Sequence, residues 1–282
     1  MSLLAPQDFQ FLADLLKSRS GLVLGPEKGY LLESRLTPVA RRRGLDDLPQ
    51  LVRLIRHKPD ETLLHEISEA MTINESFFFR DNLPFDTLAH HVLPALRTAR
   101  ANSRRLRIWS AACSTGQEPY SIAMILDQQR AMWADWTIEI IATDLSSQAI
   151  AKAQAGIYSQ FEVQRGLPIK NLMTYFTKVG DLWQISPEIR SKVKFRTFNL
   201  LQPLTPLGIF DVVFCRNVLI YFDAPTKARV LEAIRRQMPN DGSLFLGAAE
   251  TVLGLTKAFK PVRDMRGLYV PAESEAVQAI SA

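Results

Sequence analysis

Ser110-Ala-Ala-Cys-Ser-Thr-Gly-Gln-Glu-Pro-Tyr-Ser121 is the stretch of sequence that decides the fold. It joins an apolar run at 106–110, which predicts a β-strand, to a helical pattern at 118–130. Its small side chains allow the backbone to approach a ligand at the carboxyl edge of a sheet. With a single glycine it matches neither G-x-G-x-x-G nor a P-loop, and the missing Lys-Ser/Thr disfavours nucleotide hydrolysis. The stretch therefore predicts a strand–loop–helix unit whose loop is suited to close backbone contact.

Beyond this unit, short apolar runs alternate with helical patterns. Strands are predicted at 137–143, 193–198, 210–215 and 243–247, and helices at 146–155 and 226–238. Such alternation is typical of an α/β fold with a mainly parallel, doubly wound sheet. Residues 259–263 and 267–270 predict a closing hairpin that forms an antiparallel edge.

One stretch, residues 157–192, is longer than the connection between a helix and the next strand requires. Within it, residues 175–185 have β-rich flanks around Gly180-Asp181, which predicts a hairpin turn. We therefore expect a small antiparallel β-subdomain inserted in the sheet domain at about 157–192.

The first eighty residues differ, because their apolar side chains recur at helical spacing. The four stripes are Phe9, Leu12, Leu15 and Leu16; Leu31, Leu32, Leu36, Val39 and Ala40; Leu48, Leu51, Leu54 and Ile55; and Leu63, Leu64, Ile67 and Met71. Gly21 is a stop signal for the first helix, and Pro38 predicts a kink or a division into two short helices. We expect an all-helical domain at 1–82, a linker helix at 83–104, the sheet domain at 105–271 and a disordered tail at 272–282.

Composition excludes several classes of protein. The chain has 282 residues, 47% hydrophobic and 22% charged, which is ordinary for a globular protein. It contains two cysteines and four scattered histidines, so neither a disulfide scaffold nor a metal site is predicted. No apolar run is long enough to span a membrane and the N-terminus lacks the pattern of a signal peptide, so we expect a cytoplasmic protein.

The formal net charge of +5 is concentrated in two segments. The first, residues 35–58, contains seven basic side chains and only Asp46 and Asp47 as acids. The second, residues 97–107, contains five arginines and no acid. Such clusters can attract nucleic acid or an acidic protein surface, or they can be ordinary solvated helix faces.

Asp144 ends the second predicted strand of the sheet domain. A carboxylate at this position can accept both hydroxyls of a ribose, as acids at strand ends do in related sheets. The alternative is that Asp144 only caps the helix that begins near Ser146. Together with the small-residue loop at 110–121, Asp144 favours a cofactor that contains adenosine.

Four segments, taken in order, give a specific resemblance. They are Met71-Thr-Ile-Asn-Glu-Ser-Phe-Phe-Phe-Arg80, the stretch 110–121, Thr143-Asp144 and Phe214-Cys-Arg-Asn-Val-Leu-Ile-Tyr-Phe222. From about residue 5 to 270 the sequence resembles the CheR family of S-adenosylmethionine-dependent methyltransferases, which esterify glutamates on bacterial chemoreceptors. The resemblance implies a class I methyltransferase sheet, an N-terminal helical domain and an inserted β-subdomain.

The resemblance also implies the site residues. Cofactor contacts fall on Asn74, Ser76, Arg80, Glu118, Asp144, Asn199, Leu200, Asn217 and Val218. Among them, Glu118 is expected to pair with the cofactor's ammonium, Asn199 and Leu200 to contact adenine, and Asn217 and Val218 to lie under the sulfonium. Arg80 and Tyr221 are the catalytic candidates, expected to orient the glutamate. Without the resemblance, Arg80 would be read as a surface or ion-pair residue, Asn217 as a turn residue, and Tyr221 and Phe77 to Phe79 as packing.

The implied partner is the acidic helical bundle of a chemoreceptor's cytoplasmic region. Arg35, Arg41, Arg42 and Arg43 match the family's receptor-facing helix and are the predicted docking residues. The tight turn at Gly180-Asp181 lacks the glycine-rich extension of members that tether to a receptor's C-terminal pentapeptide, so we expect tether-independent action. A monomer without metal and without a nucleic-acid partner is expected.

Two other functions stay open from the sequence. A methyltransferase acting on nucleic acid would fit the basic segments, although residues 217–221 lack an Asn-Pro-Pro-aromatic motif and no RNA-binding module is visible. A non-catalytic adaptor that only binds S-adenosylmethionine is the second alternative, and the presence of Arg80 and Tyr221 counts against it.

Overall fold

A computed structural model describes residues 4–274, which form two compact units. The first unit comprises the chain up to Ile73 together with Tyr221–Thr226, and the second comprises Asn74–Ile220 and the chain from Lys227 onward. The stretch expected as a linker helix belongs to the second unit, where Phe85, Leu88 and Leu96 lie in the core. Most of the tail expected at 272–282 lies outside the described residues.

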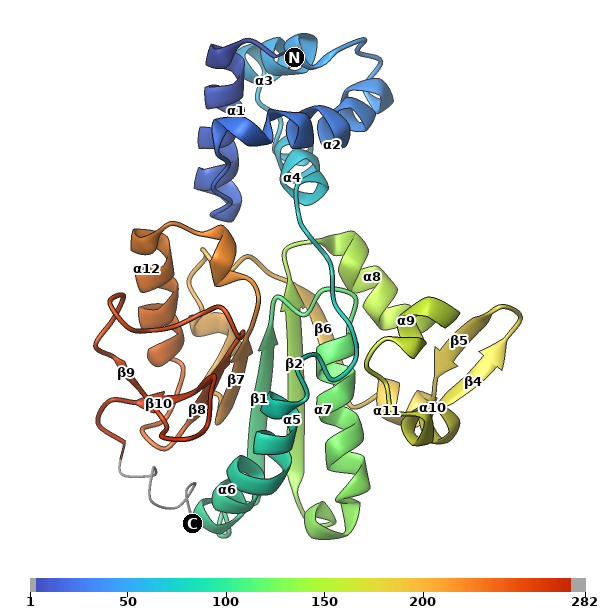
Figure 1. The fold of residues 1–282 in the computed structure, drawn as a ribbon, viewed down its shortest axis with the longest axis vertical. Helices are drawn as coiled ribbons and strands as arrows, with labels where there is room; N and C mark the ends of the chain where they lie inside the picture. Colours follow the sequence, from blue (N-terminus) through green and yellow to red (C-terminus); the bar gives the residue numbers. More distant parts are fainter. Residues whose placement is uncertain (1–3, 275–282) are drawn as a thin grey trace. The chain divides into compact units, whose positions relative to one another are not determined.

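The first unit contains helices α1 (Pro6–Ser20), α2 (Gly29–Arg42), α3 (Leu48–His57) and α4 (Glu61–Ala70), coloured blue in Figure 1. Gly21 ends α1 in the left-handed conformation, at φ 78°, as the stop signal predicted. Asp47 and Asp60 are the N-cap residues of α3 and α4, because their carboxylates accept backbone N–H groups in the first turns of these helices. The predicted stripes form one core, which contains Leu12, Leu16, Leu32, Leu36 and Ile67 among others.

Pro38 lies inside α2, and the helix runs unbroken from Gly29 to Arg42. Of the two outcomes predicted for Pro38, a kink or a division into two short helices, the division is therefore wrong. A proline removes one backbone donor and crowds the preceding turn. Here the buried side chains Leu32, Leu36 and Val39 lie on both sides of Pro38, and their packing outweighs that local cost.

The second unit is built on a seven-stranded sheet with the order β6-β2-β1-β7-β8-β10-β9. The strands are β1 (Arg105–Ala111), β2 (Thr137–Asp144), β6 (Val193–Thr197), β7 (Val212–Cys215), β8 (Ser243–Leu246), β9 (Phe259–Pro261) and β10 (Leu268–Pro271). The strands β6, β2, β1, β7 and β8 pair in parallel, and β10 pairs antiparallel with β8 and β9. This confirms the predicted mainly parallel sheet of a class I methyltransferase fold and its antiparallel edge.

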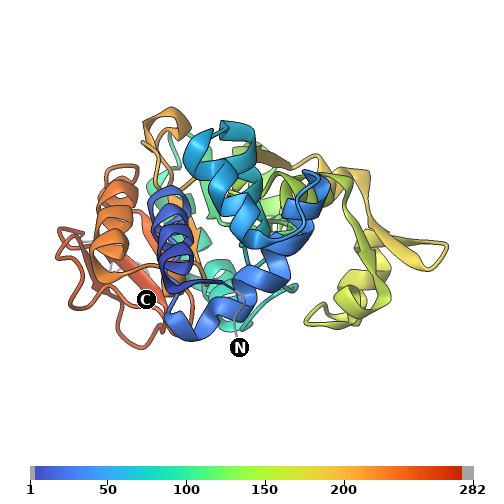
Figure 2. The same ribbon diagram turned by 90° about the horizontal axis from the view of Figure 1, so that it is seen from above.

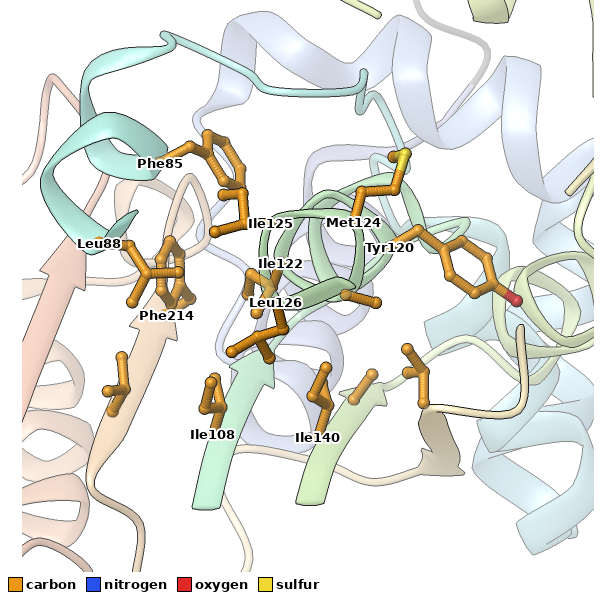
Figure 3. Packing of buried hydrophobic residues seen from close by; sticks show 14 of the residues in the cluster. Phe85, Leu88, Ile108, Tyr120, Ile122, Met124, Ile125, Leu126, Ile140 and Phe214 are labelled. Carbon is orange, nitrogen blue, oxygen red and sulfur yellow. The ribbon is translucent and has the colours of Figure 1, made fainter. Parts of the chain in front are cut away.

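Helices of the second unit cover the sheet. They are α5 (Leu83–Thr87), α6 (Leu93–Ala99), α7 (Gln117–Gln128), α8 (Ser147–Ala155) and, from Lys227 onward, α12 (Ala224–Arg235). Figure 3 shows Ile122 and Leu126 of α7 against Ile108 of β1 and Ile140 of β2. Phe85 of α5 stacks on Phe214 of β7 with ring centroids 5.8 Å apart.

A turn of π-helix, Leu88–Val92, connects α5 to α6. Pro94 follows it in the first turn of α6 and has no N–H to donate to the carbonyl of residue 90. A π-type turn accommodates this gap without ending the helical run, since local widening is a common response to a disturbed hydrogen-bond ladder.

The insertion is a three-stranded antiparallel sheet flanked by short helices. Its elements are β3 (Ile157–Ser159), α9 (Gln160–Gln164), α10 (Ile169–Tyr175), β4 (Phe176–Val179), β5 (Leu182–Ile185) and α11 (Pro187–Arg190). The order is β3-β5-β4, and Gly180, at φ 61°, lies in the predicted tight turn. In Figures 1 and 2 this subdomain, coloured yellow, projects to one side of the main sheet of its unit.

Candidate functional site

The loop after β1 has an unusual backbone. Ala112, Ser114 and Gly116 have φ values of 59°, 53° and 95°, which non-glycine residues adopt only when the surroundings hold them. The Cys113 N–H donates to the carbonyl of Thr143 at 2.9 Å, which ties the loop to the end of β2. A Cβ at Gly116 would lie 2.9 Å from the Ala153 Cβ, so only glycine allows this approach to α8. The loop is therefore fixed on both sides.

Asp144 holds this loop from the end of β2. Its carboxylate accepts the Ser114 N–H at 2.8 Å and the Ser146 N–H at 2.9 Å. The alternative that Asp144 caps α8 is wrong, because Ser146 is the N-cap and its hydroxyl accepts the Ala149 N–H at 3.1 Å. The two backbone donors orient the Asp144 carboxylate at the carboxyl edge of the sheet, where the ribose acceptor was predicted.

Residues 74–80 lie against the same loop. The Ser114 hydroxyl donates to the Asn74 carbonyl at 2.7 Å, and the Phe79 N–H donates to the Ser121 hydroxyl at 3.0 Å. Asn74 is exposed and Ser76 is half-buried. The structure thereby brings the segment that contains Asn74 and Ser76 to the loop that Asp144 orders.

Glu118 is buried at the start of α7 and is already engaged within the chain. Its carboxylate accepts the Ser110 hydroxyl at 2.8 Å and the Arg216 guanidinium at 3.0 Å. Burial raises the pKa of Glu118, although Arg216 and the Ser110 hydroxyl oppose that shift. Since an ionised carboxylate can accept about four hydrogen bonds, Glu118 retains capacity for a cationic ligand group.

Arg216 is a site residue that the sequence reasoning missed. Besides Glu118, it donates to the Asp81 carboxylate at 2.6 Å and to the Arg80 carbonyl at 2.9 Å. Its side chain is 1% exposed, and arginine is almost never buried without partners. An arginine directly after the apolar run 212–215 was the available signal, because it predicts a buried ion pair at a strand end.

Arg80 lies half-buried at the end of residues 74–80. Its guanidinium donates to the Glu75 carbonyl at 3.2 Å and lies 5.3 Å from the centroid of the Phe77 ring. Arg80 also acts electrostatically on Glu118, lowering the pKa of that carboxyl. Of the neighbouring aromatics, Phe78 is fully buried, as the packing interpretation predicted.

Asn199 and Leu200 follow β6 in a turn. The Asn199 side-chain oxygen accepts the Leu201 N–H at 3.0 Å and its carbonyl accepts the Gln202 N–H at 2.9 Å. Leu200 is buried. Both residues lie just beyond the carboxyl end of a parallel strand, as predicted for contacts to a base.

Asn217 and Val218 follow β7. Asn217 has φ 58°, and the backbone N–H groups of Asn217 and Val218 donate to the Glu250 carboxylate at 2.8 and 3.0 Å. Glu250 was also missed. It follows the small residues Gly247-Ala-Ala after β8 and is buried, and an acid directly after small residues beyond an apolar strand was the available signal.

Among the predicted cofactor and catalytic residues, Tyr221 alone lies outside the second unit. It ends a 3-10 turn, Leu219–Tyr221, and its carbonyl accepts the Val23 N–H of the first unit at 2.9 Å. Its catalytic role stays a prediction. The other predicted cofactor residues belong to the second unit, at or beside the carboxyl ends of β1, β2, β6 and β7.

Most of the predicted docking residues have partners within the first unit. Arg35 donates to the carbonyls of Met71 and Thr72 at 3.1 and 2.8 Å. Arg42 and Arg43 share the Glu66 carboxylate at 2.7 and 3.1 Å. Within residues 4–274, Arg41 makes no ion pair and is exposed, so it is the member of the set whose charge faces solvent.

The described residues contain no group of three or more side chains that could hold a metal ion. Burial raises the pKa of both thiols, Cys113 and Cys215, well above the ordinary value, so each is a neutral packing group. No helix within residues 4–274 has the length and apolar character that a membrane crossing requires.

Comparison with known proteins agrees with this geometry. Residues 74–267 match the model of the CheR methyltransferase, SAM binding domain, and residues 7–72 match that of the CheR methyltransferase, all-alpha domain. The chain is 41% identical to "Chemotaxis protein methyltransferase Cher2" of Pseudomonas putida over 94% of its own length and 98% of the relative's. It is 41% identical to "Chemotaxis protein methyltransferase 1" of Pseudomonas aeruginosa, over 95% and 99% of the two chains. With both domains present in order, the chain belongs to the CheR family of S-adenosylmethionine-binding methyltransferases.

Proposed function

We propose that this methyltransferase esterifies glutamate side chains on the cytoplasmic helices of chemoreceptors. The observation that carries the proposal is the position of Arg80. Its carbonyl and the neighbouring Asp81 are both held by Arg216, which also binds Glu118 inside the cofactor site. Arg216 thereby fixes the backbone at Arg80 and Asp81. The Arg80 guanidinium is then held beside the predicted cofactor contacts, where an acidic substrate group needs to be oriented.

The chemistry requires little of the protein beyond alignment. S-adenosylmethionine, when bound, supplies a methyl group attached to a positively charged sulfur. A carboxylate oxygen accepts this methyl group as the carbon–sulfur bond breaks. A glutamate carboxylate has a pKa near 4.3 and is ionised at neutral pH, so no general base is needed. The contribution of this chain is therefore orientation and exclusion of water.

Arg80 suits this role because its contacts are loose. The guanidinium makes one long hydrogen bond to a carbonyl and one contact with the Phe77 ring, and neither neutralises its charge. It can attract a carboxylate without the tight bidentate pairing that would weaken the nucleophile. Asp144 and Asn199 are proposed to bind the ribose and the adenine, and Asn217 and Val218 to line the methyl-bearing end.

Substrate docking is proposed to use exposed basic side chains of the first unit. Arg41, Arg53 and Lys58 are exposed and make no ion pair within residues 4–274. Three solvated cations on one small helical unit favour an acidic helical surface and speed its encounter with the enzyme. The partly paired Arg42 and Arg43 add to this field, and a docking role for Arg35 stays a prediction.

The inserted subdomain supports action that is independent of a receptor's C-terminal pentapeptide. Val179 pairs directly with Leu182, so only Gly180 and Asp181 form the turn between β4 and β5. The turn thus has no room for the glycine-rich loop of tethering members. A receptor fragment that lacks its last five residues is expected to be methylated at the same rate as the complete fragment.

A labelling experiment tests the proposed reaction. The protein is incubated with methyl-labelled S-adenosylmethionine and a panel of receptor cytoplasmic fragments or RNA. We expect label on receptor glutamates that is released by mild base, as methyl esters are. Label on RNA alone would overturn the proposal in favour of a nucleic-acid methyltransferase, and binding of the cofactor without transfer to any fragment would favour a non-catalytic adaptor.

Two variants separate the role of Arg80 from its contacts. Arg80→Ala is expected to lose most activity while it still binds S-adenosylhomocysteine. Arg165→Ala is the matched control, because Arg165 also packs on Phe77, at 4.4 Å, and pairs with Glu75 at 2.8 Å. If both variants lose activity equally, Arg80 acts only through the packing of residues 74–80.

A further inference from the structure

Glu250 binds an unusual number of backbone donors. Its Oε2 accepts the N–H groups of Asn217 at 2.8 Å and Gly247 at 2.7 Å, and its Oε1 accepts those of Val218 at 3.0 Å and Ile220 at 3.2 Å. The residue is 9% exposed. One buried carboxylate therefore satisfies four backbone N–H groups that helices or strands leave without partners.

These four donors come from two neighbouring strand ends. Gly247 follows β8, and the other three residues form the turn after β7. Parallel strands offer no hydrogen bonds to residues beyond their ends, so the turn at 217–220 has no ladder to hold it. Asn217 is in addition left-handed, at φ 58°, a conformation that persists only where surrounding contacts enforce it. Glu250 supplies those contacts.

Gly247 allows the carboxylate and the turn to meet. A Cβ at this position would lie 2.7 Å from the Glu250 Oε2 and 2.8 Å from the Asn217 side-chain nitrogen. The Asn217 side-chain amide and the Glu250 carboxylate thus both lie close to Gly247. A single methyl group here would push apart two groups that the turn requires.

We propose that Glu250 is a positioning residue for the cofactor. It acts through Asn217 and Val218, whose backbone it fixes in the conformation that contacts the methyl-bearing end of S-adenosylmethionine. The inference rests on the proposed assignment of Asn217 and Val218 to the cofactor. It extends that assignment from residues that contact the ligand to the carboxylate that orders them.

A purely structural role is the competing explanation, and the chain offers a matched control. Asp211 lies at the opposite end of β7, and its carboxylate also accepts a backbone N–H, that of Arg107 at 2.8 Å. It further accepts the Arg100 guanidinium at 3.0 Å. Asp211 and Glu250 therefore stabilise the two ends of the same strand, but only Glu250 does so at the cofactor edge.

The experiment compares Glu250→Gln with Asp211→Asn in the full chain. Glutamine has the same shape but offers one acceptor oxygen in place of two, so it cannot hold all four donors. Affinity for S-adenosylhomocysteine is measured by calorimetry, at a temperature at which circular dichroism shows both variants folded. We expect the Kd of Glu250→Gln to rise about tenfold or more. The Kd of Asp211→Asn is expected to stay within about twofold of the unchanged protein even where its Tm falls.

Activity divides the two roles further. Glu250→Gln is expected to raise the KM for S-adenosylmethionine while the KM for a receptor fragment stays unchanged. A wild-type Kd in the folded Glu250→Gln variant, or an equal loss of affinity in Asp211→Asn, would overturn the inference. The Kd for S-adenosylhomocysteine is measured without a receptor, so it tests the role of Glu250 even if the proposed methylation of receptors is not observed.

Gly247→Ala provides a second route if Glu250→Gln does not fold. It keeps the carboxylate and its charge but displaces it from Asn217, so it is also expected to weaken binding of S-adenosylhomocysteine by about tenfold. A folded Gly247→Ala variant with the affinity of the unchanged protein would contradict the proposal, because the turn would then tolerate displacement of Glu250.

Discussion

The two arginine-rich segments of this chain look alike in sequence and differ in structure. In the second unit, the arginines between residues 97 and 107 are largely taken up by acids and carbonyls distant in sequence. Arg100 binds Asp211 and Asp241 at 2.9 and 2.6 Å, and Arg107 binds Glu139 at 2.7 Å. In the first unit, by contrast, Arg41, Arg53 and Lys58 stay exposed and make no ion pair within residues 4–274.

The comparison teaches that a local excess of charge indicates a binding surface only where the fold brings no opposite charge to it. The segment at 97–107 lies at the amino end of the sheet, where Asp211 precedes β7 and Asp241 precedes β8. Arg100 of this segment therefore links the starts of two strands through its ion pairs. In the segment at 35–58, Glu66 pairs with Arg42 and Arg43, Asp60 also pairs with Arg43, and Asp8 pairs with Arg56, which leaves Arg41, Arg53 and Lys58 without an acid within residues 4–274. A nucleic-acid reading of the whole net charge therefore overestimates the available surface.

The largest expected effect is on stability in the second unit. Arg100→Ala leaves the carboxylates of Asp211 and Asp241 without their shared partner, and Arg100 is only 19% exposed. Removing one partner of a largely buried pair costs about 3 kcal/mol. Urea denaturation of the full chain measures this loss. Arg105→Ala, an exposed neighbour, is the control, and a loss below about 1 kcal/mol in Arg100→Ala would break the contrast between the segments.

The next effect is on substrate recognition in the first unit. Arg41→Glu combined with Arg53→Glu reverses two solvated charges, and we expect the KM for a receptor fragment to rise about tenfold at low ionic strength. At about 0.15 M salt the increase should shrink, since exposed charges are then screened. Arg105→Glu makes the same type of change in the other segment and should leave the KM unchanged. Equal effects from both segments would contradict selective docking.

A smaller effect concerns pH. The hydrogen bond from Arg100 lowers the pKa of Asp241 below its ordinary value of 3.8, although burial opposes this shift. A depressed folded-state pKa contributes stability that is present above pH 3.8 and is lost as the pH falls through the folded pKa. The difference in unfolding free energy between the unchanged protein and Arg100→Ala should therefore narrow below about pH 4. A constant difference down to the acid transition would argue against this pairing.

The smallest expected effect is a fall in the KM for a receptor fragment, opposite to the rise expected for the charge-reversal variant. Glu66→Gln removes the shared partner of Arg42 and Arg43, which costs at most about 1 kcal/mol because the pairs are near the surface. The two released guanidinium groups then add to the docking field, so the KM for a receptor fragment should fall, by up to about twofold. Thermal unfolding and initial-rate kinetics measure the two changes, and a raised KM would mean that the Glu66 pairs organise the docking face.

Local patterns predicted the fold well because each element has a strong local signal. The strand at 137–143 and the turn at Gly180-Asp181 were found from periodicity and turn residues alone. Asp144 was placed correctly at the end of a strand, since that position follows from the topology of parallel sheets. The sequence left open whether Pro38 kinks α2 or divides it, because packing around Pro38 depends on residues far along the chain.

The parts of the site that were missed are long-range contacts. Arg216 reaches Glu118 and Asp81 from more than ninety residues away, and Glu250, after β8, reaches Asn217 at the end of the neighbouring strand β7. No local pattern specifies which carboxylate will meet which donor. Arg35 was assigned to docking because its stretch resembles the family's receptor-facing helix, and that role stays a prediction. The contacts of its guanidinium with the carbonyls that follow α4 could not be read from the sequence. Pairing of this kind is determined by the assembled fold.

The short segment Tyr221–Thr226 has a consequence for how the protein can be divided. It groups with the N-terminal helices, where Asp223 pairs with Lys17 at 2.8 Å and Phe222 lies so close to Gly21 that a Cβ there would be 2.8 Å from the ring. The chain therefore passes from one unit to the other three times, although the boundary at residue 73 looks like a single hinge in the sequence. A protein truncated at residue 73 would leave Phe222 without the residues around Gly21 against which it packs. Exchange of the helical module between relatives thus requires that two separate stretches of chain be replaced together.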